Sequence, residues 1–245
     1  MIRVCADLES LSAVAAGLVA EEARRAVREK GRFTVALAGG GTPRRTYELL
    51  AQPPFRDAFP WNQTHIFWGD ERCVAAIDPR NNARMAREAL LDHVPIPPDH
   101  VHAMVCDQSP ADSARKYEAL LREFFEGGPP RFDLILLGLG EDGHTASLFP
   151  GSPVLGERQR WVAEVPAAEQ GLHRLTLTAQ VINQADLVIF LVSGSSKARA
   201  LREVLEETPQ PDRIPARLIR PSGRLLWLVD REAAKGLQAL QREAK

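Results

Sequence analysis

The sequence predicts an α/β protein with a doubly wound, mainly parallel sheet that carries helices on both faces. Two observations support this prediction. Several short apolar runs are uninterrupted, which is typical of strands buried on both faces of a parallel sheet. Between them lie amphipathic segments of helical periodicity, as expected when strands and helices alternate along the chain.

The expected elements follow one another from the amino terminus, each with its own signal. Amphipathic periodicity predicts the helices, and continuous apolar character predicts the strands. The helices are expected at 10–30, 43–50, 82–91, 113–125, 196–206 and 231–243, and the strands at 33–38, 65–68, 133–138, 186–192 and 224–229. Proline- and glycine-rich stretches separate these elements at intervals too short to divide domains, so residues 1–245 are expected to form one domain.

Charge and composition exclude several classes of function. A formal net charge of -1 argues against a general binder of nucleic acid or of anionic membranes. No apolar run approaches the ~20 residues that span a bilayer, and no secretory signal is expected, so a cytoplasmic protein is predicted. The three scattered cysteines, Cys5, Cys73 and Cys106, are expected to be reduced thiols rather than a disulfide framework or a zinc site.

Polar and glycine-rich segments follow four of the expected strands, where open parallel sheets bind their ligands. The first is AGGGTPRR, in which Thr42 before Pro43 predicts a helix N-cap followed by a first turn. Its glycines allow backbone N–H groups to approach an anion, and a helix amino terminus favours phosphate. A tight turn into a helix, without any ligand, is the alternative explanation of this stretch.

Two further strand ends carry cations that suit an anionic ligand. Arg72 in WGDERCV offers a guanidinium fork for phosphate oxygens, with Asp70 and Glu71 as side chains that could orient it. Lys197 in SGSSKA lies at a helix start, where a cation is unfavourable unless an anion is bound. Taken singly, the Arg72 segment is better explained as a solvated loop, and an exposed surface lysine is the alternative explanation for Lys197.

The segment LLGLGEDGHTASLFP has the G-x-G-x-x-G spacing of a dinucleotide-binding turn, formed by Gly138, Gly140 and Gly143. A diphosphate would be repelled by Glu141 and Asp142 inside that turn, and Pro150 stops any following helix early. NAD binding is therefore not expected.

The same turn presents a histidine at the end of a central strand. His144 is a candidate general base, with Asp142 or Glu141 as its orienting partner. No serine or cysteine occupies a nucleophile elbow and no histidine pair has metal-ligand spacing, so the simplest nucleophile is an activated water and no metal is expected. A purely structural histidine is the competing explanation.

Taken in order, four segments resemble the motifs of the 6-phosphogluconolactonases from about residue 33 to 230. They are AGGGTPRRTYELL, FWGDERCV with DPRNNARMAREALL, FDLILLGLGEDGHTASLFPGSP, and HRLTLT with INQADLVIFLVSGSSKARAL. The resemblance implies a modified Rossmann-like, doubly wound fold and hydrolysis of 6-phosphoglucono-δ-lactone to 6-phosphogluconate in the oxidative pentose phosphate pathway. It implies no obligatory cofactor and a small-molecule substrate, and the expected state is a monomer or a small homo-oligomer.

The resemblance also implies roles for individual residues. His144 would activate water with the support of Asp142. The phosphate would be held by residues from three of the strand ends, with Arg174 as a further contact near the sugar or phosphate: Gly40, Gly41, Thr42, Arg72 and Lys197.

The chain departs from the family pattern at two places. Many relatives have S-G-G-S-T-P where this chain has Ala38 to Pro43 without serines, which puts individual phosphate contacts in doubt but leaves the backbone donors. Ala75 stands where proline is common.

Two alternative functions remain open. A glucosamine-6-phosphate deaminase or isomerase would carry a further acidic residue after the histidine, which HTASLFP lacks. A non-catalytic sugar-phosphate-binding domain would have no need of the Asp142-Gly143-His144 turn.

Overall fold

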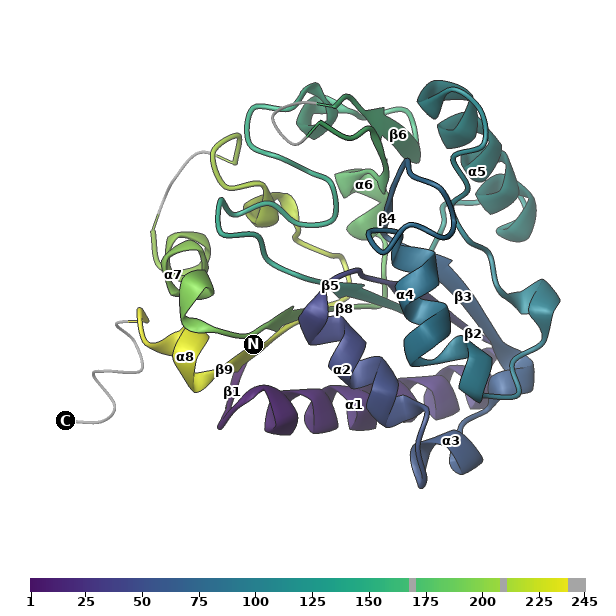
Figure 1. Ribbon diagram of the computed structural model, residues 1–245, viewed down its shortest axis with the longest axis horizontal. Helices are drawn as coiled ribbons and strands as arrows, with labels where there is room; N and C mark the ends of the chain where they lie inside the picture. Colours follow the sequence, from purple (N-terminus) through teal and green to yellow (C-terminus); the bar gives the residue numbers. More distant parts are fainter. Residues whose placement is uncertain (168–170, 208–210, 238–245) are drawn as a thin grey trace.

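A parallel sheet forms the centre of the protein (Figure 1). The computed structural model describes residues 1–167, 171–207 and 211–237. Within them, six strands pair in the order β1-β9-β8-β5-β2-β3, all parallel. These strands are β1 (Ile2–Cys5), β2 (Phe33–Leu37), β3 (Thr64–Trp68), β5 (Leu134–Leu137), β8 (Leu187–Val192) and β9 (Arg224–Asp230).

A second, smaller sheet is antiparallel and has the order β4-β7-β6 in the described part of the chain. Its strands are β4 (Asp70–Arg72), β6 (Val162–Val165) and β7 (Arg174–Leu177). Figure 1 shows β4 and β6 on one side of the large sheet, near α5, and α1 on the opposite side. Helix α5 packs against β6 and β7.

The α-helices connect the strands. They are α1 (Leu8–Lys30), α2 (Gly41–Leu50), α3 (Phe55–Ala58), α4 (Asn82–Ala89), α5 (Pro110–Phe124), α6 (Ala179–Ile182), α7 (Ala198–Leu205) and α8 (Arg231–Ala234). Short 3-10 turns cover Trp61–Gln63, Leu91–His93, Pro98–His100, Pro153–Gly156, Ser195–Lys197 and Pro215–Leu218.

Helix α1 shows how the sequence sets these elements. Its first turn is capped by Asp7, whose side chain accepts the Ser10 N–H at 2.8 Å. Its buried face is rich in alanine, including Ala15, Ala16 and Ala23. Small side chains let a helix lie close to the sheet, so α1 packs against β1, β2 and β9.

The two sheets are joined at Gly69, the residue between β3 and β4. Its N–H donates to the Leu37 carbonyl of β2 at 2.9 Å, and its carbonyl accepts the Leu177 N–H of β7 at 2.8 Å. One residue therefore contributes a hydrogen bond to each sheet. This junction fixes where β4 emerges above the carboxyl ends of β2 and β3.

The predicted fold class is confirmed, and each of the five predicted strands is present within a residue or two of its expected bounds. Strands β1, β4, β6 and β7 were not predicted. Helix 82–91 is shorter than expected, because α4 ends at Ala89 and a 3-10 turn follows. Helix 231–243 is observed only as α8, and its residues 238–243 lie outside the described part of the chain.

The prediction of three reduced cysteines is wrong. Cys73 and Cys106 form a disulfide across a sequence separation of 33 residues, and Cys5 is free and buried. The fold brings the end of β4 and the segment before α5 to a Cα–Cα distance of 5.1 Å, which suits a disulfide. A spacing this long, outside any known motif, gives no signal in the sequence.

Across residues 1–167, 171–207 and 211–237, no helix has the length and apolar character needed to cross a bilayer.

Candidate active site

A cleft of about 270 Å³ opens at the carboxyl ends of β2 and β5. These two strands are neighbours in the sheet, and the chain proceeds in opposite directions from them, from β2 to β3 and from β5 to β8 and β9. Such a reversal of direction leaves a crevice beyond the strand ends, where open α/β sheets bind ligands. The cleft contains the side chains of Asp70, Arg72, His144, Arg174 and Lys197 together with Gly39, Gly40 and Gly138.

His144 and Asp142 lie in contact within the turn that follows β5. The His144 Nδ1 is 2.6 Å from Asp142 Oδ1, and the same oxygen accepts the His144 backbone N–H at 3.1 Å. The ring also packs against Phe149, with a centroid distance of 4.4 Å. The structure thus places Asp142 beside the histidine, whereas Glu141 lies 3.8 Å from Lys197 Nζ.

The contact with Asp142 fixes which ring nitrogen carries a proton. Burial raises the pKa of Asp142, but the hydrogen bonds from the His144 ring and backbone lower it by more than burial raises it. The net pKa of Asp142 is therefore below its ordinary value. An ionised carboxylate only accepts hydrogen bonds, so Nδ1 must be the protonated nitrogen. The lone pair of the neutral ring is then on Nε2, the nitrogen available to a water.

Gly140 makes room for this pair. A Cβ at residue 140 would lie 2.1 Å from His144 Nδ1 and 2.5 Å from Asp142 Oδ1. The Gly140 N–H also donates to the His144 carbonyl at 2.8 Å, which closes the turn. The middle glycine of the G-x-G-x-x-G spacing is therefore required by the His144–Asp142 contact. The chain from His144 to Pro150 forms turns rather than the helix of a dinucleotide-binding motif.

Two arginines are opposite each other on adjacent strands of the small sheet. Arg72 in β4 and Arg174 in β7 are register partners in an antiparallel ladder, and both contribute to the cleft. Burial and then the charge of Arg72 lower the pKa of Arg174. Like charges opposite each other destabilise a sheet, so an anion in the cleft would relieve this repulsion.

Arg72 is held by the loop that follows its strand. Its Nη1 donates to the Arg80 carbonyl at 2.6 Å. Glu71, expected as a partner of the guanidinium, accepts the Arg72 backbone N–H at 2.7 Å and also those of Asn82 and Ala83 at the start of α4. Burial raises the pKa of Glu71 to about 7.

Lys197 reaches the cleft from the 3-10 turn before α7. That turn begins after Gly194, whose N–H donates to Asp230 Oδ2 at 3.0 Å. Asp230 also accepts the Ser193 hydroxyl at 2.5 Å and the Ala233 N–H at 2.8 Å. A buried aspartate at the end of β9 therefore sets the position of the lysine loop, and the sequence pattern did not reveal it.

The start of α2 differs from the prediction in detail. Thr42 is not the N-cap: the helix begins at Gly41, and Gly40 is the N-cap with a φ of 103°. Glycine adopts that conformation without strain, which moves the helix start upstream of the threonine. Gly40 contributes to the cleft, whereas the phosphate contacts predicted for Gly41 and Thr42 stay predictions.

Two residues that line the cleft were not among the predicted site residues. Gly39 approaches Asn82 so closely that a Cβ would lie 2.0 Å from Asn82 Oδ1. Asp70, considered only as a partner for Arg72, accepts the buried Ser147 hydroxyl at 2.6 Å. A glycine beside two other glycines gives no separate signal, which explains the first omission.

A larger cavity of about 460 Å³ adjoins the cleft. The two share Arg174, and Asp142 lines the larger one. Its remaining walls are largely apolar and include Phe149, Pro150 and Val165. Arg72 and Lys197 line the polar cleft and not this cavity, so the cleft is the better site for an anion.

Comparison with known proteins identifies the family. Residues 6–227 match the family described as glucosamine-6-phosphate isomerases/6-phosphogluconolactonase. A 6-phosphogluconolactonase of Synechocystis sp. is 46% identical over 87% of this chain and 88% of its own length, and one of Nostoc sp. is 41% identical over 96% and 98%. The solved 6-phosphogluconolactonase of Trypanosoma cruzi superposes with a TM-score of 0.84 at 32% identity, over 97% of this chain and 96% of its own. The chain belongs to the glucosamine-6-phosphate isomerase/6-phosphogluconolactonase family.

Proposed function

We propose that the protein is an enzyme that hydrolyses 6-phosphoglucono-δ-lactone to 6-phosphogluconate, a step of the oxidative pentose phosphate pathway. One observation carries the proposal beyond family membership. His144, whose ring contacts Asp142, lines the same cleft as Arg72 and Arg174, so a candidate base and two cations suited to an anion share one cleft. A phosphorylated substrate with an electrophilic carbonyl needs both.

In the proposed mechanism His144 acts as the general base. Nε2 takes a proton from a water as the water oxygen forms a bond to the lactone carbonyl carbon, and the carbonyl electrons move to its oxygen. The tetrahedral intermediate then collapses: the bond to the ring oxygen breaks, and the leaving oxygen takes the proton back from Nε2. Asp142 keeps the ring oriented and stabilises its transient positive charge.

The phosphate supplies binding energy rather than chemistry. Arg72, Arg174 and Lys197, with the backbone N–H groups around Gly40, are proposed to hold its oxygens. Because the phosphate is remote from the carbonyl, this binding energy can orient the ring over His144.

The test measures the rate of lactone opening. The lactone also opens spontaneously, and this spontaneous rate is the baseline. The purified protein is added to freshly generated 6-phosphogluconolactone, and acid release is followed against a buffer blank and against His144→Ala. Acceleration by the wild type alone supports the proposal, and release at the spontaneous rate contradicts it. Ammonia release from glucosamine 6-phosphate would instead favour the deaminase activity.

Two wider statements are part of the proposal. The protein is proposed to act in the cytoplasm, as a monomer or a small homo-oligomer, on a small molecule rather than on nucleic acid. Disulfides in a reducing compartment are usually transient or redox-sensing, so the Cys73–Cys106 bond requires an explanation of its own.

A further inference from the structure

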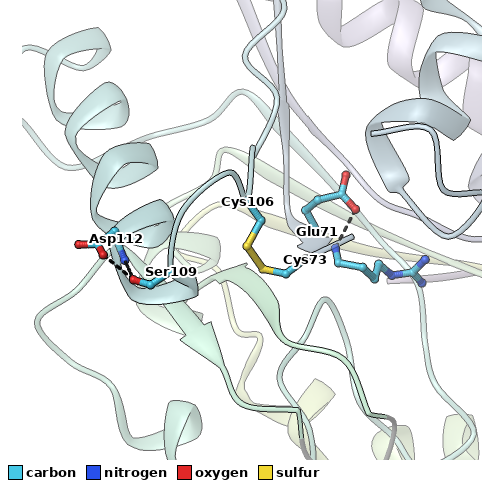
Figure 2. Close-up of a disulfide and its surroundings, with 6 residues drawn as sticks. Glu71, Cys73, Cys106, Ser109 and Asp112 are labelled. Carbon is cyan, nitrogen blue, oxygen red and sulfur yellow. Dashed lines mark hydrogen bonds between the residues drawn. A yellow bond between two sulfur atoms is a disulfide. The ribbon is translucent and has the colours of Figure 1, made fainter. Parts of the chain in front are cut away.

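The Cys73–Cys106 disulfide lies beside both arginines of the cleft. Cys73 directly follows Arg72, and its N–H donates to the carbonyl of His173 at 2.9 Å, one residue before Arg174. Figure 2 shows the bond between Cys73, next to Glu71, and Cys106, on the segment that leads to Ser109 at the start of α5. The bond therefore joins the arginine strands to a separate part of the chain.

The disulfide also restrains the loop that holds the Arg72 guanidinium. This loop, residues 73–80, begins at Cys73 and ends at Arg80, whose carbonyl accepts the Arg72 Nη1. Within the loop Asp78 Oδ2 and Arg80 Nη2 are 2.7 Å apart. The covalent bond anchors one end of the loop, and the start of α4 anchors the other.

A reductant can reach the bond. Both cysteines are only partly buried, and Val105, next to Cys106, has 52% of its surface exposed. A dithiol supplies a thiolate that attacks one sulfur, which breaks the Cys73–Cys106 bond and forms a mixed disulfide. The second thiol of the reductant then attacks the reductant sulfur of this mixed disulfide, which forms the cyclic disulfide of the reductant and releases the protein cysteine. Two electrons and two protons thus pass to the protein, and two cysteine thiols result.

We propose that Cys73–Cys106 is a redox-sensitive site that controls the affinity of the cleft for phosphate; this rests on the proposed function. In the oxidised protein, loop 73–80 keeps the Arg80 carbonyl beside the Arg72 guanidinium. Reduction removes the covalent restraint at Cys73 and leaves its hydrogen bond to His173, so the loop is held less firmly and the guanidinium samples more orientations. Phosphate binding weakens, while kcat is retained because His144 and Asp142 lie on the separate turn after β5.

The experiment compares the oxidised and reduced protein without substitutions first. Thiol titration of the folded protein counts the groups released by excess dithiothreitol, and calorimetry measures the Kd of inorganic phosphate in both states. KM and kcat for the lactone are measured in parallel. We expect reduction to raise Kd and KM together on the order of tenfold, the scale of one weakened charge-assisted hydrogen bond, with kcat unchanged.

Variants separate this effect from simple stabilisation. Cys73→Ser/Cys106→Ser should have the weak phosphate affinity of the reduced protein and no response to dithiothreitol. Cys5→Ala keeps the disulfide and should respond like the wild type. A bond that resists reduction in the folded protein, an unchanged Kd after full reduction, or a lowered Tm with unchanged Kd and KM would each overturn the proposal.

The same measurements distinguish failure of the proposed function. If the oxidised protein does not accelerate lactone opening at all, the lactonase assignment is wrong, whatever the disulfide does. If the oxidised protein is active and reduction leaves KM unchanged, only the redox proposal is wrong.

Discussion

The proton on the His144 ring is the residue-scale feature on which the proposed chemistry depends. Its place on Nδ1 follows from the 2.6 Å contact with Asp142 and from the lowered pKa of that carboxyl group. The sequence could predict the histidine and a neighbouring carboxylate. It could not choose between Asp142 and Glu141, because that choice depends on the path of the turn rather than on the spacing.

Replacement of His144, the proposed base, should affect catalysis much more than binding. For His144→Ala we expect kcat to fall by roughly 10² to 10⁴-fold, the usual contribution of a general base, with the Kd of 6-phosphogluconate nearly unchanged. Steady-state kinetics and calorimetry measure the two quantities. His93→Ala, at an exposed histidine, is the control. A near-normal kcat in His144→Ala would exclude the histidine as the base.

Gly140→Ala should damage the same pair without removing either member. The added methyl group would meet His144 Nδ1 at 2.1 Å, so the ring or the carboxylate must move. A displacement of about 1 Å at a reacting group can cost on the order of 10²-fold in rate. Gly156→Ala is the matched control, since nothing lies within 4 Å of its added Cβ. Equal kcat values for the two variants would show that Gly140 has no such role.

The β4–β7 ladder is the element that carries the two arginines of the proposed anion site. Because Arg72 and Arg174 are opposite each other in this ladder, their roles should be coupled. Arg72→Ala and Arg174→Ala should each raise KM and the Kd of phosphate by roughly 10- to 100-fold, the range for a hydrogen bond to a charged group. Arg28→Ala, exposed on α1, serves as the control.

The double variant tests the coupling. Each single substitution also removes the repulsion between the two arginines, which phosphate binding would otherwise relieve. The double variant can lose that relief only once, so Arg72→Ala/Arg174→Ala should lose less affinity for phosphate than the two single losses combined. Unchanged phosphate affinity in both single variants would contradict the assignment of an anion site to this ladder.

A histidine cluster at β3 makes stability depend on pH. Burial, and then the charges of His100, His102 and Arg32, lower the pKa of His65 from 6.5 to about 4, against the opposing effect of Asp99. The unfolded chain therefore binds more protons than the folded protein between these two values. The contribution of His65 to the free energy of unfolding should therefore fall as the pH drops from 6.5 towards 4.

Urea denaturation at several pH values measures this dependence. The raised pKa of Glu71 acts in the opposite direction, so the comparison is between variants that all retain Glu71. His65→Gln removes the titrating ring and should gain stability relative to the wild type as the pH falls, whereas His93→Gln, at the exposed histidine, should not. Parallel curves for the wild type and His65→Gln would exclude His65 as the source.

The elements differ in how well the sequence predicts them. Strands β2, β5 and β8 are buried on both faces, so each is a continuous apolar run that stands out. Strand β4 consists of the three charged residues Asp70, Glu71 and Arg72, a sequence typical of a loop. It becomes a strand through its ladder to β7, a pairing that local sequence does not encode.

At the scale of the whole molecule, the site follows from topology. The motifs after β2 and β5 could be placed together from sequence, because neighbouring parallel strands end at the same edge. Arg174 and Cys106 could not be placed in the same way, since the small sheet and the segment before α5 are positioned by long-range packing. The single-domain organisation stays a prediction.

The Gly69 junction gives the cleft a fixed span. The proposed phosphate contacts of Arg72 and Arg174 belong to the small sheet, while His144 follows a strand of the large one, and Gly69 bonds to both sheets. The separation between the proposed anion site and the proposed base is thus set by how the two sheets are joined, so the distance from phosphate to carbonyl in a substrate should decide whether it reacts. A phosphorylated lactone one carbon shorter should compete in binding assays through its phosphate yet react slowly, because its carbonyl stops short of His144.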